Sequence, residues 1–272
     1  MDPLPHVRQP FDFSEPIRYA HGPDSVAQEG VPQGRVVEHQ FADSRVFPGT
    51  SRRYWVYAPA EAASSQAGLM VFQDGRMYLD PKGEIRAGVV LDNLIHHGEM
   101  PPTIGVFVDP GEPGNRNVEY DAFTDAYATF LLTEILPMVL DTYDIADDPD
   151  QWGICGGSSG GSCALTVAWM RPDRFRRVIS FLGSFAQLEG GNAYPQLIRQ
   201  TPKKPIRAFL QAATRDLGWN QPEFNWLSAN LQVAAALAER GYDLRFVLGD
   251  GGHDANHGGA ILPDALRWLW RP

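Results

Sequence analysis

The chain has 272 residues, of which 43% are hydrophobic, so one large α/β domain or two small domains would fit its length. Its net charge is −10, from 23 Lys and Arg against 33 Asp and Glu, which argues against nucleic acid or an anionic membrane as a partner because both select basic surfaces. The first residues lack the basic start and apolar segment of a secretory signal, and no apolar run approaches the roughly 20 residues of a membrane span.

The two cysteines, Cys155 and Cys163, flank a glycine-rich turn. A disulfide between them would have to cross that turn, so we expect two buried free thiols. Free thiols are typical of a reducing compartment, and we therefore expect a cytoplasmic protein.

The N-terminal quarter of the chain predicts an arm followed by strands. Residues 1–33 are rich in proline and polar side chains without sustained periodicity, and we expect them to form an ordered arm or lid packed on the domain. Apolar and polar residues alternate over 35–41 and 52–57, which predicts an antiparallel hairpin. The continuous apolar run 69–72 predicts a central strand that is covered on both faces.

Helical and strand-like segments alternate over the rest of the chain. Strands are predicted after the hairpin at 103–108, 152–155, 178–182, 206–210 and 244–248, and helices at 88–97, 123–143, 163–171, 224–239 and 263–270. The second of these helices should bend near Pro137. This alternation predicts an α/β fold with a mostly parallel central sheet of about eight strands and helices on both faces. With no composition break, residues 34–272 are expected to form a single domain.

The stretch WGICGGSSGGS (152–162) has the pattern of a nucleophile elbow, a sharp strand-to-helix turn that exposes a serine. The motif G-x-S-x-G fits Ser158 and also Ser159. We favour Ser158 because it leaves Gly160 and Gly161 at the start of the helix, where close packing against the sheet is needed. The alternative of a phosphate-binding loop lacks the required lysine.

Two loops after later strands carry partners for this serine. Asp216 is the only carboxylate in the loop after 206–210, and His253 lies in the loop after 244–248. The order Ser158, Asp216, His253 is that of α/β-hydrolases, in which the imidazole takes the serine proton and the carboxylate orients the imidazole. Asp250 is the rival acid.

His257 lies four residues after His253, a spacing that on a helix could hold zinc. The flanking glycines, Gly251, Gly252, Gly258 and Gly259, make a helix there unfavourable, and no third ligand is evident. We therefore expect no metal and no cofactor, and a structural or pocket-lining role for His257.

An acyl-transfer site also needs donors for the oxyanion of the tetrahedral intermediate. The backbone N–H of Ser159, directly after the nucleophile, is one candidate. The second should come from the loop after 69–72, at Gly75 or Arg76.

With these residues placed, the chain resembles the putative esterase family of α/β-hydrolases, which includes enterochelin esterases, feruloyl and acetyl-xylan esterases and esterase D. The resemblance rests on 52–60, 69–75, 92–111, 115–121, the elbow, 171–185 and 249–259. It implies an α/β-hydrolase fold without a large cap domain, and it places Ser158, Asp216 and His253 at the nucleophile, acid and base positions. Where the family often has glycine in G-x-x-D, this chain has Ala213.

The resemblance also implies residues at the mouth of the site. Arg116, Glu119 and Tyr120 match a charged R-x-x-E-Y segment, which could bind substrate or form an ion pair that fixes a loop. Phe185, Trp219 and Trp226 are candidates to line the acyl or sugar side of an open cleft, although large aromatics are more often core residues.

We therefore expect a serine carboxylic-ester hydrolase that acts on a moderately bulky carbohydrate, aromatic-acyl or siderophore-like ester through an acyl-enzyme. The alternatives are a lactone hydrolase or acyltransferase with the same triad, and a non-catalytic relative that binds a small molecule. The expected partner is a small ester, with no nucleic acid and no membrane, and the sequence leaves monomer and homodimer open.

Overall fold

The computed structural model describes residues 17–60, 66–188 and 190–272. Within these ranges the chain forms one eight-stranded sheet with the order β1-β2-β4-β3-β5-β6-β7-β8. Strand pairing is antiparallel between β1, β2 and β4 and parallel from β4 to β8, so the mostly parallel sheet that the sequence predicts is confirmed. The strands are β1 (Arg35–Phe41), β2 (Arg52–Ala58), β3 (Gly68–Gln73), β4 (Thr103–Val108), β5 (Trp152–Gly157), β6 (Arg177–Phe181), β7 (Arg207–Ala213) and β8 (Asp243–Gly249).

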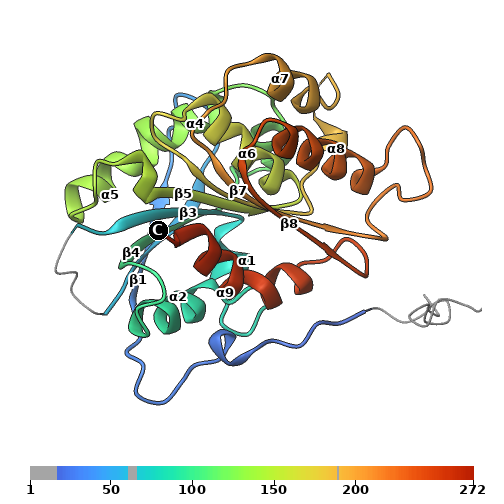
Figure 1. Ribbon diagram of the computed structural model, residues 1–272. Coiled ribbons are helices and arrows are strands. Elements are labelled where there is room, and N and C mark those ends of the chain that lie inside the picture. Colours follow the sequence, from blue (N-terminus) through green and yellow to red (C-terminus); the bar gives the residue numbers. More distant parts are fainter. Residues whose placement is uncertain (1–16, 61–65, 189) are drawn as a thin grey trace, which may run out of the picture.

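Helices cover both faces of the sheet (Figure 1). One face carries α1 (Gly75–Leu79), α2 (Ala87–His96) and α9 (Asn256–Trp270). The other face carries α4 (Ala126–Phe130), α5 (Leu136–Thr142), α6 (Ser159–Met170), α7 (Tyr194–Gln200) and α8 (Trp226–Glu239), and the short α3 (Arg116–Tyr120) packs against α6.

Strand β3 shows why the sheet is buried on both sides. Its side chains alternate between the faces, so Leu69 and Val71 join the core beneath α4 to α8, whereas Met70 and Phe72 join the core beneath α1, α2 and α9. All four are fully buried. Because both sets are apolar, the strand lacks the alternation of a half-exposed strand and appears in the sequence as a continuous apolar run.

The long helix predicted over 123–143 is divided in the structure. Helix α4 ends at Phe130, a π-helical segment η2 covers Leu131–Ile135, and α5 follows from Leu136. This π-helical segment ends two residues before Pro137. Proline has no backbone N–H, and its ring collides with the preceding turn of a regular α-helix. The predicted break near Pro137 is therefore present.

Several elements differ in their bounds from the sequence prediction. Strand β7 continues to Ala213, which shortens the loop before Asp216, and the short helices α1, α3 and α7 were not predicted. The largest difference is α9, which begins at Asn256 instead of 263 and so includes Gly258 and Gly259.

Close packing explains why glycines lie inside α9. A Cβ on Gly259 would lie 1.7 Å from the carbonyl oxygen of Glu84, and a Cβ on Gly258 would lie 2.9 Å from the Phe181 ring. Glycine weakens a helix by about 1 kcal/mol relative to alanine. Here it allows the first turns of α9 to pack directly against Glu84 and Phe181. Tertiary packing therefore outweighs the local helix propensity.

The predicted arm, 1–33, lies in part outside the described residues. From residue 17 onward it runs beneath α2 and α9 (Figure 1). Asn93 of α2 donates to the carbonyl oxygens of Asp24 and Val26, and Arg267 of α9 pairs with Asp24 at 2.8 Å.

Both cysteines are buried free thiols, as expected from their positions around the turn. Among the described residues, no helix combines the length and apolarity that crossing a membrane requires.

Candidate active site

Ser158 occupies a strained turn between β5 and α6. Its backbone has φ 58° and ψ −127°, a conformation that non-glycine residues rarely adopt. Its N–H donates to Phe181 O at 2.8 Å and its carbonyl accepts from Ser184 N at 3.1 Å, so hydrogen bonds to neighbouring segments maintain the strained backbone conformation. A Cβ on Gly156 would lie 2.4 Å from the carbonyl carbon of Gly160, which explains why both flanking positions of the motif are glycine.

The geometry distinguishes the two serines of the motif. Ser158 has the positive φ of a nucleophile elbow, whereas Ser159 is the first residue of α6 and is only 2% exposed. Ser158 is therefore the serine whose hydroxyl reaches the site.

His253 lies between Ser158 and Asp216. Its Nε2 is 2.9 Å from Ser158 Oγ, and its Nδ1 is 2.5 Å from Asp216 Oδ1. Asp216 is fully buried, and its Oδ1 also accepts from Leu217 N at 2.7 Å. The rival Asp250 bonds through its backbone N–H and carbonyl to Tyr19, so Asp216 is the carboxylate that contacts the imidazole.

The two loops that carry Asp216 and His253 are joined by backbone hydrogen bonds. Thr214 N donates to Gly249 O at 2.9 Å, and Arg215 N donates to Gly251 O at 2.8 Å. The buried Trp226 packs edge-to-face on the His253 ring with centroids 4.7 Å apart. These contacts fix the plane of the imidazole relative to its two partners.

A small, mostly apolar pocket of about 180 Å³ opens at Ser158 and His253. It meets a much larger cleft of about 1170 Å³, and Met77, Arg116 and Ala255 line both cavities. The apolar wall of the small pocket consists of Met77, Tyr78, Ile85, Phe181 and Leu182.

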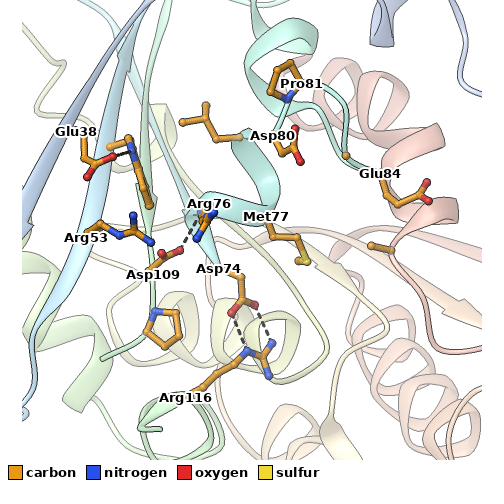
Figure 2. Close-up of a pocket in the computed structure, with 15 residues that line it drawn as sticks. Glu38, Arg53, Asp74, Arg76, Met77, Asp80, Pro81, Glu84, Asp109 and Arg116 are labelled. Atoms are coloured by element: carbon orange, nitrogen blue, oxygen red, sulfur yellow. Dashed lines mark hydrogen bonds and ion pairs between the residues drawn. The ribbon is translucent and has the colours of Figure 1, made fainter. Parts of the chain in front are cut away.

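The large cleft is lined by many charged groups (Figure 2). Arg116 forms a bidentate pair with Asp74 at 2.7 and 2.8 Å, and although burial lowers the pKa of Arg116, these hydrogen bonds and the charge of Asp74 raise it above its ordinary value. Close to Asp74, Arg76 N donates to Asp109 Oδ1 at 2.9 Å (Figure 2). Burial raises the pKa of Asp109.

The candidate oxyanion donors differ in what they already bind. The N–H of Ser159 belongs to the first turn of α6, where backbone N–H groups have no acceptor within the helix. The Arg76 N–H is donated to Asp109, so this amide is already engaged. Gly75 packs so tightly on β4 that a Cβ would lie 2.4 Å from the carbonyl carbon of Phe107.

Of the R-x-x-E-Y segment, only Arg116 lines the cleft. Glu119 forms a fully buried ion pair with Arg52 at 2.6 Å, and Tyr120 lies beneath the site, where its hydroxyl accepts from Asp74 N at 3.3 Å. Glu119 and Tyr120 therefore support the loop from below and do not line the cleft. Of the two interpretations of the segment, an ion pair that fixes a loop describes Glu119.

The aromatic candidates also differ from the expected cleft lining. Phe185 is fully buried with its ring against Tyr194, in a short segment that packs against α6 and α8. Trp219 is 48% exposed and packs under the Arg215 guanidinium, which lies 4.1 Å from the ring centroid. Among the described residues that line the two cavities, neither aromatic is present.

His257 is not part of a shared site with His253. It lies on α9, its Nδ1 is 3.1 Å from Gln211 Nε2, and its ring stacks on Tyr19 with centroids 4.0 Å apart. Burial lowers the pKa of His257. His257 therefore packs against Tyr19 and Gln211, in an environment that favours its neutral form.

Asp74 and Asp109 line the cleft but were not predicted from the sequence. Each follows directly after a buried parallel strand, β3 or β4, at the edge where functional loops gather. That position is the signal that could have identified both.

Residues 46–261 match the model of the family described as "Putative esterase". The chain is 27% identical over 223 residues to an iron(III) enterobactin esterase of Escherichia coli strain K12 and 28% identical over 237 residues to one of Dickeya dadantii strain 3937. These alignments cover 82% and 80% of this chain but 54% and 51% of the relatives, so the chain spans about half the length of the curated relatives it matches.

Solved structures show the same fold. A crystal structure of the enterobactin esterase from Shigella flexneri, in the presence of enterobactin, aligns with a TM-score of 0.76 at 22% identity, covering 92% of this chain and 61% of that one. A ferulic acid esterase from Anaeromyces mucronatus, in complex with ferulic acid, aligns with a TM-score of 0.71 at 18% identity, covering 91% and 94%. The expected α/β-hydrolase fold without a large cap is confirmed.

We predict that Glu119→Gln lowers the free energy of unfolding by about 3–5 kcal/mol, because it leaves the buried Arg52 guanidinium without its carboxylate. Chemical denaturation measures this loss. In the matched exposed pair, Glu239→Gln beside Arg199 should change stability little. A Glu119→Gln variant of full stability with a raised KM would contradict the structural role.

We also predict that stability falls as the pH decreases through 6.5, the ordinary pKa of histidine. The folded pKa of His257 is lowered, so the unfolded chain binds the proton more readily and acid favours unfolding. The difference in melting temperature between about pH 7.5 and about pH 5 should be smaller in His257→Gln than in the wild type. An equal difference in both proteins would assign the effect to other groups.

Proposed function

The chain belongs to the putative esterase family, and we propose that it is a serine carboxylic-ester hydrolase that uses Ser158, His253 and Asp216. The observation that supports this most strongly is the single imidazole that lies 2.9 Å from a strained serine and 2.5 Å from a buried carboxylate. A serine hydroxyl is a weak nucleophile until such a base removes its proton.

In the proposed reaction, His253 Nε2 takes the proton of Ser158 Oγ as that oxygen attacks the ester carbonyl. The tetrahedral intermediate collapses when the imidazolium returns the proton to the leaving alkoxide, and the alcohol departs from an acyl-serine. His253 then removes a proton from water, whose oxygen attacks the acyl carbonyl, and Ser158 leaves with the proton restored. The products are one alcohol and one carboxylic acid.

Asp216 has two roles in this proposal. Its hydrogen bond to Nδ1 holds the tautomer in which Nε2 can accept a proton, and its charge stabilises the imidazolium. Full burial of Asp216 strengthens this attraction, because water screens it little. The oxyanion is stabilised by the N–H of Ser159 together with a second amide at Gly75 or Arg76, and Arg76 serves only if Asp109 releases it.

The two cavities suggest how an ester is bound. A compact apolar group fits the small pocket beside Ser158, and the bulkier part fits the large cleft. Such an ester can be an aromatic acyl, carbohydrate or siderophore-like compound, and the relatives and structural neighbours include enterobactin esterases and a ferulic acid esterase.

The charges that line the large cleft narrow the class of ester that it would bind. Five carboxylates and three guanidinium groups line it; Arg116 is paired with Asp74, and Glu84 is paired with Arg18, which does not line the cleft. The carboxylates are Glu38, Asp74, Asp80, Glu84 and Asp109, and the guanidinium groups are Arg53, Arg76 and Arg116. This surplus of carboxylates favours a neutral or cationic ester over a polyanionic one.

We predict that Ser158→Ala lowers kcat on a p-nitrophenyl ester by at least about 10⁴-fold, and that Asp216→Asn lowers it by roughly 10³- to 10⁴-fold. Ser159→Ala, which retains its backbone N–H, should lose no more than about tenfold. Circular dichroism establishes that each variant is folded. Full activity of folded Ser158→Ala would refute the proposed function.

The charge of the cleft predicts selectivity between esters of matched shape. At low ionic strength, kcat/KM for a neutral feruloyl ester should exceed that for its carboxylated analogue by up to about tenfold, and added salt should reduce the difference because it screens the cleft. Steady-state kinetics with both esters at two salt concentrations measures this. A preference for the anionic ester that salt weakens would show that the three arginines dominate instead.

A further inference from the structure

The described part of the N-terminal arm lies against the loop that carries His253. This loop joins β8 to α9 and contains Gly251, with φ 109°, and Gly252 directly before the histidine. Two successive glycines give a backbone wide conformational freedom. The position of the imidazole therefore depends on what holds the loop from outside.

The side chain of Tyr19 holds both ends of the loop. At one end, its hydroxyl accepts from Asp250 N at 2.7 Å and lies 3.1 Å from Asp250 O, to which it donates. At the other end, its ring stacks on His257 with centroids 4.0 Å apart and planes inclined by 15°. One aromatic residue thus spans the segment in which His253 lies.

The backbone of Tyr19 is fixed just as firmly. Tyr19 N donates to Asn256 Oδ1 at 2.6 Å, and Asn256 Nδ2 donates to Tyr19 O at 3.1 Å. Asn256 is 3% exposed, and its Nδ2 also reaches Glu84 Oε2 at 2.9 Å. A single buried amide therefore connects the arm, the first turn of α9 and the segment before α2.

Glu84 connects this network to the cleft, which it lines. Arg18 pairs with Glu84 Oε1 at 2.7 Å, and the His21 ring nitrogen Nε2 lies 2.7 Å from Glu84 O. The hydrogen bond from Asn256 and the charge of Arg18 lower the pKa of Glu84, so it stays ionised and bound. The arm therefore joins the His253 loop to Glu84, a residue that lines the cleft.

The other side of the loop is held by the acid loop, through the hydrogen bonds from Thr214 to Gly249 and from Arg215 to Gly251, and by the contacts of the His253 ring with Asp216 and Trp226. If the contacts with Tyr19 are removed, the two glycines before His253 leave the loop backbone free to shift, and any shift changes the distance from the imidazole to Ser158. A displacement of about 1 Å in a reacting group can cost about 100-fold in rate.

We propose that Tyr19 is a positioning residue for the proposed esterase reaction: it holds the His253 loop so that the imidazole stays within hydrogen-bond distance of Ser158. Tyr19 touches no reacting atom. Its hydroxyl fixes Asp250 and its ring supports His257, and both act on His253 through the loop. This inference rests on the proposed function.

The test compares Tyr19→Phe, which keeps the stacked ring but removes the hydroxyl, with Tyr19→Ala, which removes both. We expect kcat on a p-nitrophenyl ester to fall about tenfold in Tyr19→Phe and about 100-fold in Tyr19→Ala. KM should change less than about twofold in both, because Tyr19 does not line the described cavities.

The matched control is Asp24→Asn, on the same arm. It removes the ion pair with Arg267 but leaves the His253 loop untouched. It should lower the melting temperature without changing kcat at temperatures well below unfolding. If the arm only stabilised the fold, Tyr19→Phe would behave in the same way, with a lower melting temperature and an unchanged kcat, and that result would overturn the proposal.

The two proposals fail in different ways. An inactive wild-type protein, or an active Ser158→Ala variant, would refute the esterase assignment itself. An active wild type whose activity depends on Ser158, combined with full kcat in folded Tyr19→Phe and Tyr19→Ala, would refute only the role of the arm.

Discussion

The site depends on one imidazole that two other side chains hold in place. His253 can contact Ser158 only because β5 ends in a turn with positive φ, and it can contact Asp216 only because β7 and β8 are neighbours and end side by side. The sheet order therefore determines which residues meet. The glycines around Ser158 are needed because that turn leaves no room for Cβ atoms.

Buried polar contacts beneath the cleft maintain this arrangement. The Arg52–Glu119 pair anchors the segment from which Arg116 reaches Asp74, and Tyr120 bonds to the backbone of Asp74 from below. Such pairs cost desolvation energy, and here they fix the loop that carries Arg116. The cleft is thus shaped in part by Arg52, Glu119 and Tyr120, which do not line it.

The sequence could predict that Ser158, Asp216 and His253 come together, because each follows a strand of the parallel part of the sheet and their chain order is that of a known fold. Their roles in catalysis stay predictions. Other features required tertiary information that local patterns lack. The sequence predicts too late a start for α9, because glycine at position 259 is required by its contact with Glu84 and not by a break in the helix. It predicts Phe185 in the cleft, because a buried aromatic and a cleft-lining aromatic look alike in a sequence.

Covalent labelling tests the central claim most directly, because it requires an activated serine and no knowledge of the natural ester. The protein is treated with a fluorophosphonate, and its intact mass and the labelled peptide are measured by mass spectrometry. We expect one adduct per chain, on Ser158, formed rapidly by the wild type and far more slowly by folded His253→Ala. A folded wild-type protein that takes no label, or one labelled on another residue, would contradict it.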